Sequence, residues 1–296
     1  KYRFATIGLF GVLATLWGFS FLAIAVGLES LEPVLFAAFR YDIAAAILIG
    51  YVLCTDSTWR PTDRANLSAV LAGGVFLVGS NVFLFIGQQS VSSGIAAIMQ
   101  SLLPIMTSLW ALGLLPEERI SMIGAIGIGL GFVGVGLVVR PDSSRLLGSD
   151  FVGQLLILLQ VAGVSLGGVL IQRVSPTIDK AALSGWSMLT GGVLLHTVSV
   201  GIGESFALPS TIAASAAVAY LGIFATAIAY FIYFTLLNVR GALETSLVSY
   251  LVPIVATIAG VVLLGESITP LTVVGFLVVF IGFIILKRRA IANVVT

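Results

Sequence analysis

The chain has 296 residues, of which 59% are hydrophobic and only 9% are charged. Soluble domains carry about 25% charged residues, so we expect an integral membrane protein surrounded by a lipid bilayer. The net charge of +1 excludes the broad basic surface that nucleic-acid binding requires. One cysteine and one histidine are too few for a disulfide framework or a Cys/His metal site. We therefore expect no metal and no cofactor.

In chain order, charges, prolines and polar clusters divide the sequence into apolar segments. A spanning helix needs about 20 apolar residues, so the chain has room for about ten spans and for no separate soluble domain. The first segment follows Lys1, Tyr2 and Arg3 and is longer than the roughly 7 to 15 apolar residues of a signal peptide, so we expect a retained helix. The predicted spans are residues 4–28, 33–54, 68–89, 92–115, 120–140, 151–172, 180–202, 211–237, 241–264 and 270–287.

The basic residues predict how these spans are oriented. With the N-terminus inside, eleven of the 14 Lys and Arg residues lie on one side of the membrane, and only Arg140 and Arg145 lie on the other. Because cytoplasmic loops carry such an excess, we expect both termini in the cytoplasm.

The two halves of the chain repeat a pattern. IMQSLLPIMTSLWALGLLPE ends at Glu117 and LVSYLVPIVATIAGVVLLGE ends at Glu266, and a constant offset of 149 residues also places Pro104 on Pro253. Residues 1–148 and 149–296 are therefore predicted to be two five-helix repeats. Five is an odd number, so the second repeat enters the membrane from the opposite face. Inverted repeats with a substrate site at their interface are characteristic of secondary transporters.

The segment QQSVSSGIAAIMQSLLPIMTSLWALGLLPEERIS and its partner TLLNVRGALETSLVSYLVPIVATIAGVVLLGESIT resemble the paired EamA repeats of the drug/metabolite transporter superfamily. LWGFSF at residues 16–21, followed by Arg40 in the second span, is similar to the opening pattern of that family. The whole chain most resembles bacterial exporters of aromatic amino acids and related metabolites. This resemblance implies an all-α membrane protein of ten transmembrane helices in two inverted five-helix repeats, which exports small metabolites.

Pro104 and Pro253 predict a substrate site near the middle of the membrane. Each proline would lie deep in its span, and a proline inside a helix frees the carbonyl four residues earlier, here that of Gln100 or Ser249. We expect a kink, a free carbonyl and polar side chains in both repeats, with the prolines as hinges or gates. The alternative is that Gln100 and Ser249 only satisfy the backbone at two structural kinks.

Further polar and aromatic residues lie at similar depths. Polar side chains could bind the amino and carboxylate groups of a zwitterion, and aromatic rings could stack on an aromatic or apolar substrate; packing between helices is the alternative for each of them. Besides Gln100 and Ser249, the candidates are Trp17, Ser20, Arg40, Asn81, Ser101, Gln160, Ser165, Trp186, Tyr230 and Tyr250.

Arg40 and Asp42 are ionisable residues inside the second span. Such charges should face protein or a water-filled cavity, and Arg40 could bind a substrate carboxylate through its planar fork or form a fixed ion pair. Residues two apart on a helix do not face each other, so we expect Asp42 to pair with another helix or to carry a coupling proton. Glu244 is a second coupling or gating candidate, expected at the start of the ninth span; pairing with Arg240 is the alternative. We assign no role to His196.

Four glycines of the fifth span, Gly124, Gly127, Gly131 and Gly134, follow helical spacing. A stripe without side chains allows a neighbouring helix to approach closely. We favour packing of this stripe against the tenth helix over dimerisation. The stripe does not decide the oligomeric state; separately, we expect the protein to function as a monomer.

The inverted repeat predicts a transporter that works by alternating access. The resemblance implies that it exports small metabolites, aromatic or large neutral amino acids, across the bacterial inner membrane. The absence of a GxxxxGK[ST] motif excludes ATP hydrolysis by a P-loop in this chain. An exporter of cationic drugs or other metabolites is the closest alternative, with Asp42 as the cation-binding acid, whereas a selective pore lacks a charge ring or filter-like repeat. An intramembrane enzyme would need a nucleophile and base or a metal cluster, so we expect no enzyme and no catalytic residues.

Overall fold

The computed structural model describes residues 2–55, 58–116, 121–139 and 148–295, and these residues form helices and connections without a strand. The first half contains α1 (Tyr2–Leu28), α2 (Pro33–Leu53), α3 (Arg64–Ala72), η1 (Gly73–Gly79), α4 (Asn81–Gly87), α5 (Ser93–Gln100), α6 (Leu103–Leu114) and α7 (Met122–Val139). The second half contains α8 (Ser149–Val174), α9 (Lys180–Gly201), α10 (Ile212–Ala219), η2 (Tyr220–Ile228), α11 (Ala229–Ser246), α12 (Val248–Leu264) and α13 (Pro270–Val295). Each of the ten predicted spans falls on this helical framework, which confirms the all-α fold class.

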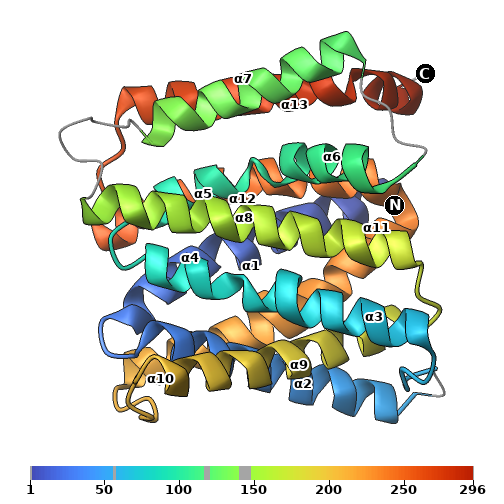
Figure 1. Cartoon of the computed structure of the whole chain (residues 1–296). Helices are drawn as coiled ribbons and strands as arrows, with labels where there is room; N and C mark the ends of the chain where they lie inside the picture. The colour runs from blue at the N-terminus through green and yellow to red at the C-terminus, as the bar shows by residue number, and fades with distance from the viewer. Residues whose placement is uncertain (1, 56–57, 117–120, 140–147, 296) are drawn as a thin grey trace.

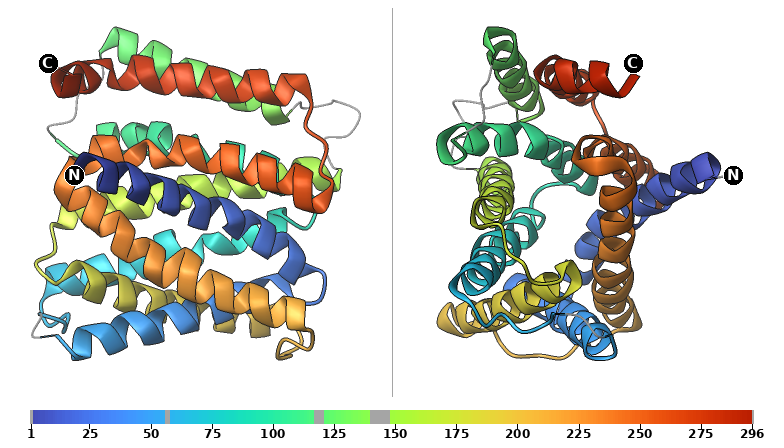
Figure 2. Two further views of the ribbon diagram at one scale, coloured as in Figure 1. Left: turned by 180° about the vertical axis from the view of Figure 1, so that it is seen from behind. Right: turned by 90° about the vertical axis from the view of Figure 1, so that its right-hand side faces the viewer.

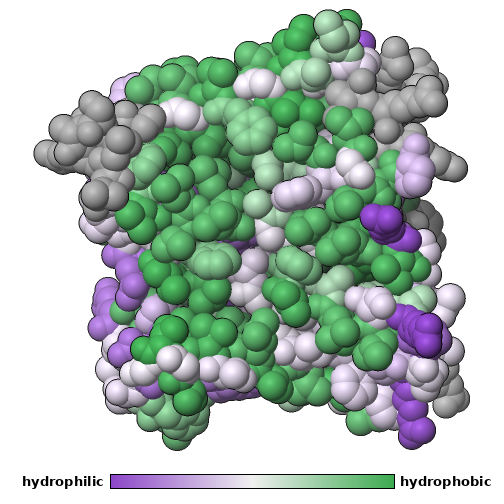
Figure 3. Space-filling view, viewed as in Figure 1, coloured by the Kyte–Doolittle hydropathy of each residue, from purple (hydrophilic) through white to green (hydrophobic). Residues whose placement is uncertain are grey.

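The helices have the length and composition that a bilayer requires. Eight helical segments in the described part of the chain are long and apolar enough to cross a membrane, and Val248–Leu264 is a shorter apolar helix. The remaining span is α9, a helix of 22 residues. Figure 3 shows an apolar band between two edges where the polar side chains gather. The apolar band is the surface that lipid tails cover.

Most of the helices run side by side along roughly one direction, and α1 and α11 run obliquely to them (Figures 1 and 2). Both chain termini lie at one end of the bundle, which we call the terminal end (Figures 1 and 2). The connections α1–α2, α4–α5 and α9–α10 lie at the opposite end, which we call the far end. The pair α7–α13 forms one edge of the bundle and the pair α2–α9 forms the other. Each pair joins one helix of each half.

The third and eighth spans show the inverted relationship of the halves directly. Each contains a π-helical segment in its middle, η1 in the third span and η2 in the eighth. η1 packs on α9, where a Cβ added at Gly74 would lie 2.8 Å from the Thr190 side chain. η2 packs on α2, where a Cβ added at Gly222 would lie 2.6 Å from the Ile43 side chain. Each π segment therefore contacts a helix of the opposite half.

The two prolines differ in their local structure. Pro104 lies at the start of α6, after a break at Ser101 and Leu102 that separates α5 from α6. Pro253 lies inside the continuous helix α12. The fourth span is therefore a broken helix at its proline, whereas the ninth span passes through its proline without a break.

The predicted connection at residues 238–240 is wrong. α11 continues to Ser246, and the break before α12 falls at Leu247. The equivalent connection in the first half contains Ser90 and Ser92, which favour helix ends and caps. The corresponding stretch of the second half, LNVRG at residues 237–241, has one glycine and no serine, so the helix continues through it.

The glycine stripe of α7 packs against α13. A Cβ added at Gly127 would lie 2.5 Å from the carbonyl oxygen of Gly282, and a Cβ added at Gly134 would lie 2.6 Å from that of Gly275. The backbones of the two helices are thus in direct contact, as expected from the stripe. A Cβ added at Gly131 would instead lie 2.4 Å from the side chain of Ile105 in α6.

Candidate substrate site

Arg40 lies at the centre of an aromatic cluster. Its guanidinium Nε donates to the hydroxyl of Thr226 in η2 at 2.8 Å, and its carbon CZ lies 5.1 Å from the ring centroid of Tyr41. Tyr230 lies within electrostatic range of both Arg40 and Tyr41. Seven residues separate Arg40 from the start of α2 at Pro33, which corresponds to about 10 Å of helix. The guanidinium is therefore held inside the membrane layer by a neutral partner.

The aromatic wall continues from α11 to α1. Tyr233 lies 6.4 Å from Tyr230 and 5.7 Å from Trp17, measured between ring centroids. Tyr41 is buried, while Arg40 and these three rings are partly exposed. The ion pair between Asp42 and His196 does not include Arg40. Arg40 thus keeps its positive charge without an acidic partner in the described part of the chain. We call Arg40, Thr226, Tyr41, Tyr230, Tyr233 and Trp17 the arginine–aromatic cluster.

A second group joins three predicted residues from three helices. The Gln100 amide at the end of α5 donates to the Gln160 side-chain oxygen in α8. The Gln160 amide donates to the Asn81 side-chain oxygen at 3.3 Å, and the Asn81 amide donates to the Leu77 carbonyl at 2.7 Å. This chain of amides, which we call the amide chain, ends on the backbone of the π segment η1. Buried amides bonded in this way satisfy one another and hold the helices in register.

The predicted serines bond mainly to their own helices. Ser20 donates to the Trp17 carbonyl at 2.5 Å, Ser101 to the Ile98 carbonyl at 2.6 Å, and Ser165 to the Val161 carbonyl at 2.7 Å. Ser249 is partly exposed on the first turn of α12. Their hydroxyl oxygens can still accept hydrogen bonds, but the donor protons of the first three are engaged locally.

Two predicted aromatic residues lie apart from the arginine–aromatic cluster. Trp186 stacks on Trp59 with centroids 6.2 Å apart and donates its indole N–H to the Trp59 carbonyl at 2.8 Å. Tyr250 packs between Phe280 and Phe283, and its buried hydroxyl has no hydrogen-bond partner among the described residues. Trp186 therefore belongs to a packing cluster beside the connection that carries Trp59.

Asp42 pairs with another helix, as the sequence led us to expect. Its carboxylate lies 2.7 Å from Nε2 of His196 in α9. Glu244 falls in the last turns of α11 rather than at the start of the ninth span, and its side chain lies outside the described residues. Glu117, the other acid of the repeated motif, is outside the described residues as well.

Two acids of the second half bind helix N-termini of the first half at the far end. Glu266 accepts hydrogen bonds from the backbone N–H groups of Ser93 and Gly94, and Glu204 accepts them from those of Val34 and Leu35. The sequence pattern identified Glu266 only as the end of a repeated motif and did not identify Glu204. Both acids stabilise helix starts, where unpaired N–H groups and the helix dipole attract negative charge.

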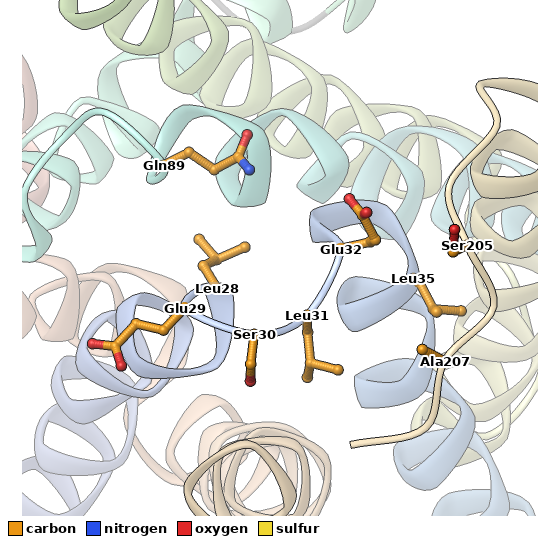
Figure 4. Close-up of a pocket in the computed structure, with 9 residues that line it drawn as sticks. All are labelled: Leu28, Glu29, Ser30, Leu31, Glu32, Leu35, Gln89, Ser205 and Ala207. Carbon is orange, nitrogen blue, oxygen red and sulfur yellow. The ribbon is translucent and has the colours of Figure 1, made fainter. Parts of the chain in front are cut away.

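A hollow of about 370 Å³ opens at the same end of the bundle. Figure 4 shows the side chains of Glu29 and Glu32 on the α1–α2 connection, with Gln89 across the hollow. Ser205 from the α9–α10 connection lines it as well. Polar groups from three connections thus surround the opening, which makes the far end accessible to water.

Sequence reasoning missed Thr226, Tyr41 and Tyr233 of the arginine–aromatic cluster, although local signals for them exist. Thr226 and Tyr233 lie four residues before and three residues after Tyr230, so the three share one face of a helix. Tyr41 follows Arg40 directly. The link between Arg40 and Thr226 spans 186 residues, and no local pattern reveals it.

A broken helix, π segments and polar side chains inside an apolar bundle of inverted halves define a membrane transporter. Comparison with known proteins agrees with this class. The EamA-like transporter family model matches residues 5–140 and 151–288. The chain belongs to the EamA-like transporter family.

The relatives are also transporters by name. The chain is 31% identical over 267 residues to the uncharacterized inner membrane transporter YedA of Escherichia coli K12, covering 88% of this chain and 84% of YedA. It is 28% identical over 279 residues to an uncharacterized transporter of Archaeoglobus fulgidus, covering 93% of this chain and 96% of that protein. A crystal structure with 19% sequence identity superposes with a TM-score of 0.66 over 97% of this chain and 98% of its own. That similarity shows the fold.

Proposed function

We propose that the protein is a secondary transporter that exports amino acids with aromatic or large neutral side chains across the bacterial inner membrane. It alternates access between two inverted halves, residues 1–148 and 149–296, with both termini in the cytoplasm and the prolines Pro104 and Pro253 as hinges. It acts as a single chain and catalyses no covalent reaction. The bias of basic residues supports the orientation, and the resemblance to metabolite exporters supports the direction.

The observation that carries the proposal is the arginine–aromatic cluster. A charged guanidinium inside a bilayer needs a partner, and Thr226 bonds only one of its N–H groups in the described contacts. A carboxylate matches the remaining N–H groups in a bidentate arrangement. The rings of Tyr230, Tyr233 and Trp17 offer apolar faces against which a large or aromatic side chain can stack. An amino acid supplies both groups.

The amide chain supports a second part of the same site. Gln100 is the last residue of α5, and the turn that follows it interrupts the α-helical hydrogen bonds: the N–H groups of Ser101 and Leu102 bond to carbonyls three residues back. Backbone of this kind within a membrane faces protein or a water-filled cavity. We assign the substrate's amino group to the polar groups around Gln100, with Ser101 and Ser249 as further candidates.

The proposal is tested by counterflow in proteoliposomes loaded with unlabelled amino acid. We expect saturable exchange of labelled phenylalanine or leucine by the wild-type protein, and a loss of tenfold or more in Arg40→Ala. Arg173→Ala, which removes an exposed arginine at the end of α8, is the matched control and should exchange normally. Absence of exchange for every aromatic, aliphatic and charged amino acid by folded protein would overturn the amino-acid assignment.

The same assay separates the alternatives. Exchange of organic cations without amino acids would favour a cationic drug exporter, although Asp42, the acid that this alternative requires, is paired with His196. Formation of a new product from the substrate by the detergent-solubilised protein would favour an intramembrane enzyme. Net transport in vesicles that hold the protein in a single orientation would show in which direction it moves the substrate.

A further inference from the structure

We propose that the Asp42–His196 pair binds the proton that is coupled to transport. This inference rests on the transport function proposed above. The two side chains come from opposite halves, Asp42 from α2 and His196 from α9, and their closest atoms lie 2.7 Å apart. Imidazole is the side chain that ordinarily changes charge between pH 5 and 8. A carboxylate beside it gives a proton two adjacent acceptors.

The surroundings of the pair favour one bound proton. Asp42 is nine residues into α2, about 14 Å from the helix start. The side chains of His196 and Asp42 are 33% and 43% exposed at the edge of the α2–α9 interface. The ring of Phe39 covers part of the imidazole, with 6.0 Å between ring centroids. In this apolar layer an unprotonated pair would carry a net negative charge, which is costly within a bilayer. One proton makes the pair neutral overall.

No other charged group is available to neutralise the pair among the described side chains nearby. On α2, Arg40 is directed towards Thr226 of η2 and not towards Asp42, because residues two apart on a helix do not share a face. Beyond α9, Glu204 is engaged with the N-terminus of α2 and with Ser199. η1, α4 and α10 contain no charged or titratable residue. Of the remaining described groups on α2, α9 and the elements that pack against them, Tyr41, Tyr51, Tyr220, Tyr230 and Tyr233 are phenols, and Arg64, Lys180 and Arg240 lie towards the terminal end.

The position of the Asp42–His196 pair allows its proton to exchange with water and to respond to a movement of the helices. His196 lies five residues before the end of α9, about 8 Å from the far end of the helix. A proton can therefore exchange with water at that end. Because Asp42 and His196 lie on different helices, a shift of α2 along α9 during the change of access would lengthen the contact between them. A separated pair loses the shared proton, so proton release and the change of access are linked.

The single histidine of the chain makes the site directly observable. The experiment uses protein labelled with ¹³C,¹⁵N-histidine, purified through an affinity tag that contains no histidine and placed in lipid nanodiscs. Solid-state NMR then reports the protonation of His196 alone. We expect the protonation of His196 to change reversibly with pH in the wild type, and to follow a different pH dependence in Asp42→Asn. Asp150→Asn, at an exposed acid in the first turn of α8, is the control and should leave the pH dependence unchanged.

A second measurement follows protons during transport. With a pH-sensitive dye in the lumen of proteoliposomes, wild-type transport should change the lumenal pH, whereas Asp42→Asn and His196→Gln should retain substrate exchange and lose the pH change. An imidazole that does not titrate, or titrates identically in Asp42→Asn, would overturn the proposal. So would a normal pH change in both variants. A titrating pair in protein that transports no amino acid would instead contradict the proposed substrate class and leave the proton site intact.

Discussion

The carboxylate of Glu266 accepts a hydrogen bond from the backbone N–H of Ser93 at 2.8 Å, across 173 residues of sequence. Its second oxygen accepts from the next N–H group, that of Gly94, at 3.1 Å. Ser93 begins α5, the first part of the broken fourth span, so an acid of the second half caps a helix of the first. Glu204 caps α2 in the same manner. Two such contacts fasten the halves together at the far end.

The cap at α5 predicts a measurable loss of stability. Glu266→Ala should lower the free energy of unfolding by about 1–2 kcal/mol because two helix N–H groups lose their acceptor. Glu266→Gln, which keeps one acceptor oxygen but loses the charge, should lie between Ala and wild type. Thermal unfolding in detergent provides the comparison. Glu32→Ala is the control, because Glu32 is exposed and makes no side-chain cap at α2. Equal losses in Glu266→Ala and Glu32→Ala would contradict this account.

The contact between α7 and α13 predicts opposite effects at two glycines of one helix. Gly134→Ala places a methyl group 2.6 Å from the Gly275 carbonyl, whereas a Cβ at Gly136 meets nothing within 4 Å. We expect Gly134→Ala to destabilise the protein by about 1–3 kcal/mol. Gly136→Ala should be neutral or slightly stabilising, because alanine favours helix. The unfolding temperatures of the two variants test this prediction. Equal unfolding temperatures would contradict close packing of Gly134 against α13.

Thr226 predicts a positioning effect on substrate binding. Thr226 is fully buried, and its hydroxyl accepts from Nε of Arg40. Thr226→Val preserves the shape of the side chain and removes the acceptor, so the guanidinium should lose its fixed orientation. We expect the half-saturating amino-acid concentration in counterflow to rise about 5- to 20-fold, equivalent to about 1–2 kcal/mol. Thr226→Ser should restore it, since a hydroxyl returns. If Thr226 only packs against its neighbours, Thr226→Val should raise the half-saturating concentration less than Thr226→Ser does.

The amide chain predicts coupling between Gln100 and Gln160. Each single alanine variant leaves the partner amide partly unsatisfied, so the double variant should cost less stability than the sum of the two singles. If Gln100 also contacts substrate, Gln100→Ala should reduce exchange more strongly than Gln160→Ala at similar loss of stability. A packing role alone would reduce exchange equally in both. Unfolding temperatures and exchange rates of the three variants distinguish these outcomes.

Much of this fold follows from composition and repetition. Long apolar segments predict helices, and the equal spacing around Pro104 and Pro253 predicts the inverted halves. The extension of α11 to Ser246 was not predicted, because serine content sets the connection in one half and the other half lacks it. The π segments η1 and η2 carry no local sequence signal that we recognise. Their positions depend on how two helices of opposite halves pack.

Several residues of the candidate site could be predicted from the sequence, but Thr226, Tyr41 and Tyr233 were missed. The contacts between the site residues could not be predicted. Arg40, Asn81, Gln100 and Gln160 were identifiable because polar residues in apolar spans are costly and need partners. Their partners lie 60 to 186 residues away, and tertiary folding alone brings them together. The same reason explains why His196 received no role from the sequence. Its relation to Asp42 exists only in the folded chain.

The central claim is that Arg40 binds the carboxylate of an amino acid. The most direct measurement is competition in counterflow between labelled phenylalanine and either unlabelled phenylalanine or its uncharged-carboxyl analogue, phenylalaninamide. In wild-type protein, phenylalanine should compete at least tenfold better than the amide, and Arg40→Ala should lose both the affinity and this preference. Equal competition by the acid and the amide in wild-type protein would contradict the claim.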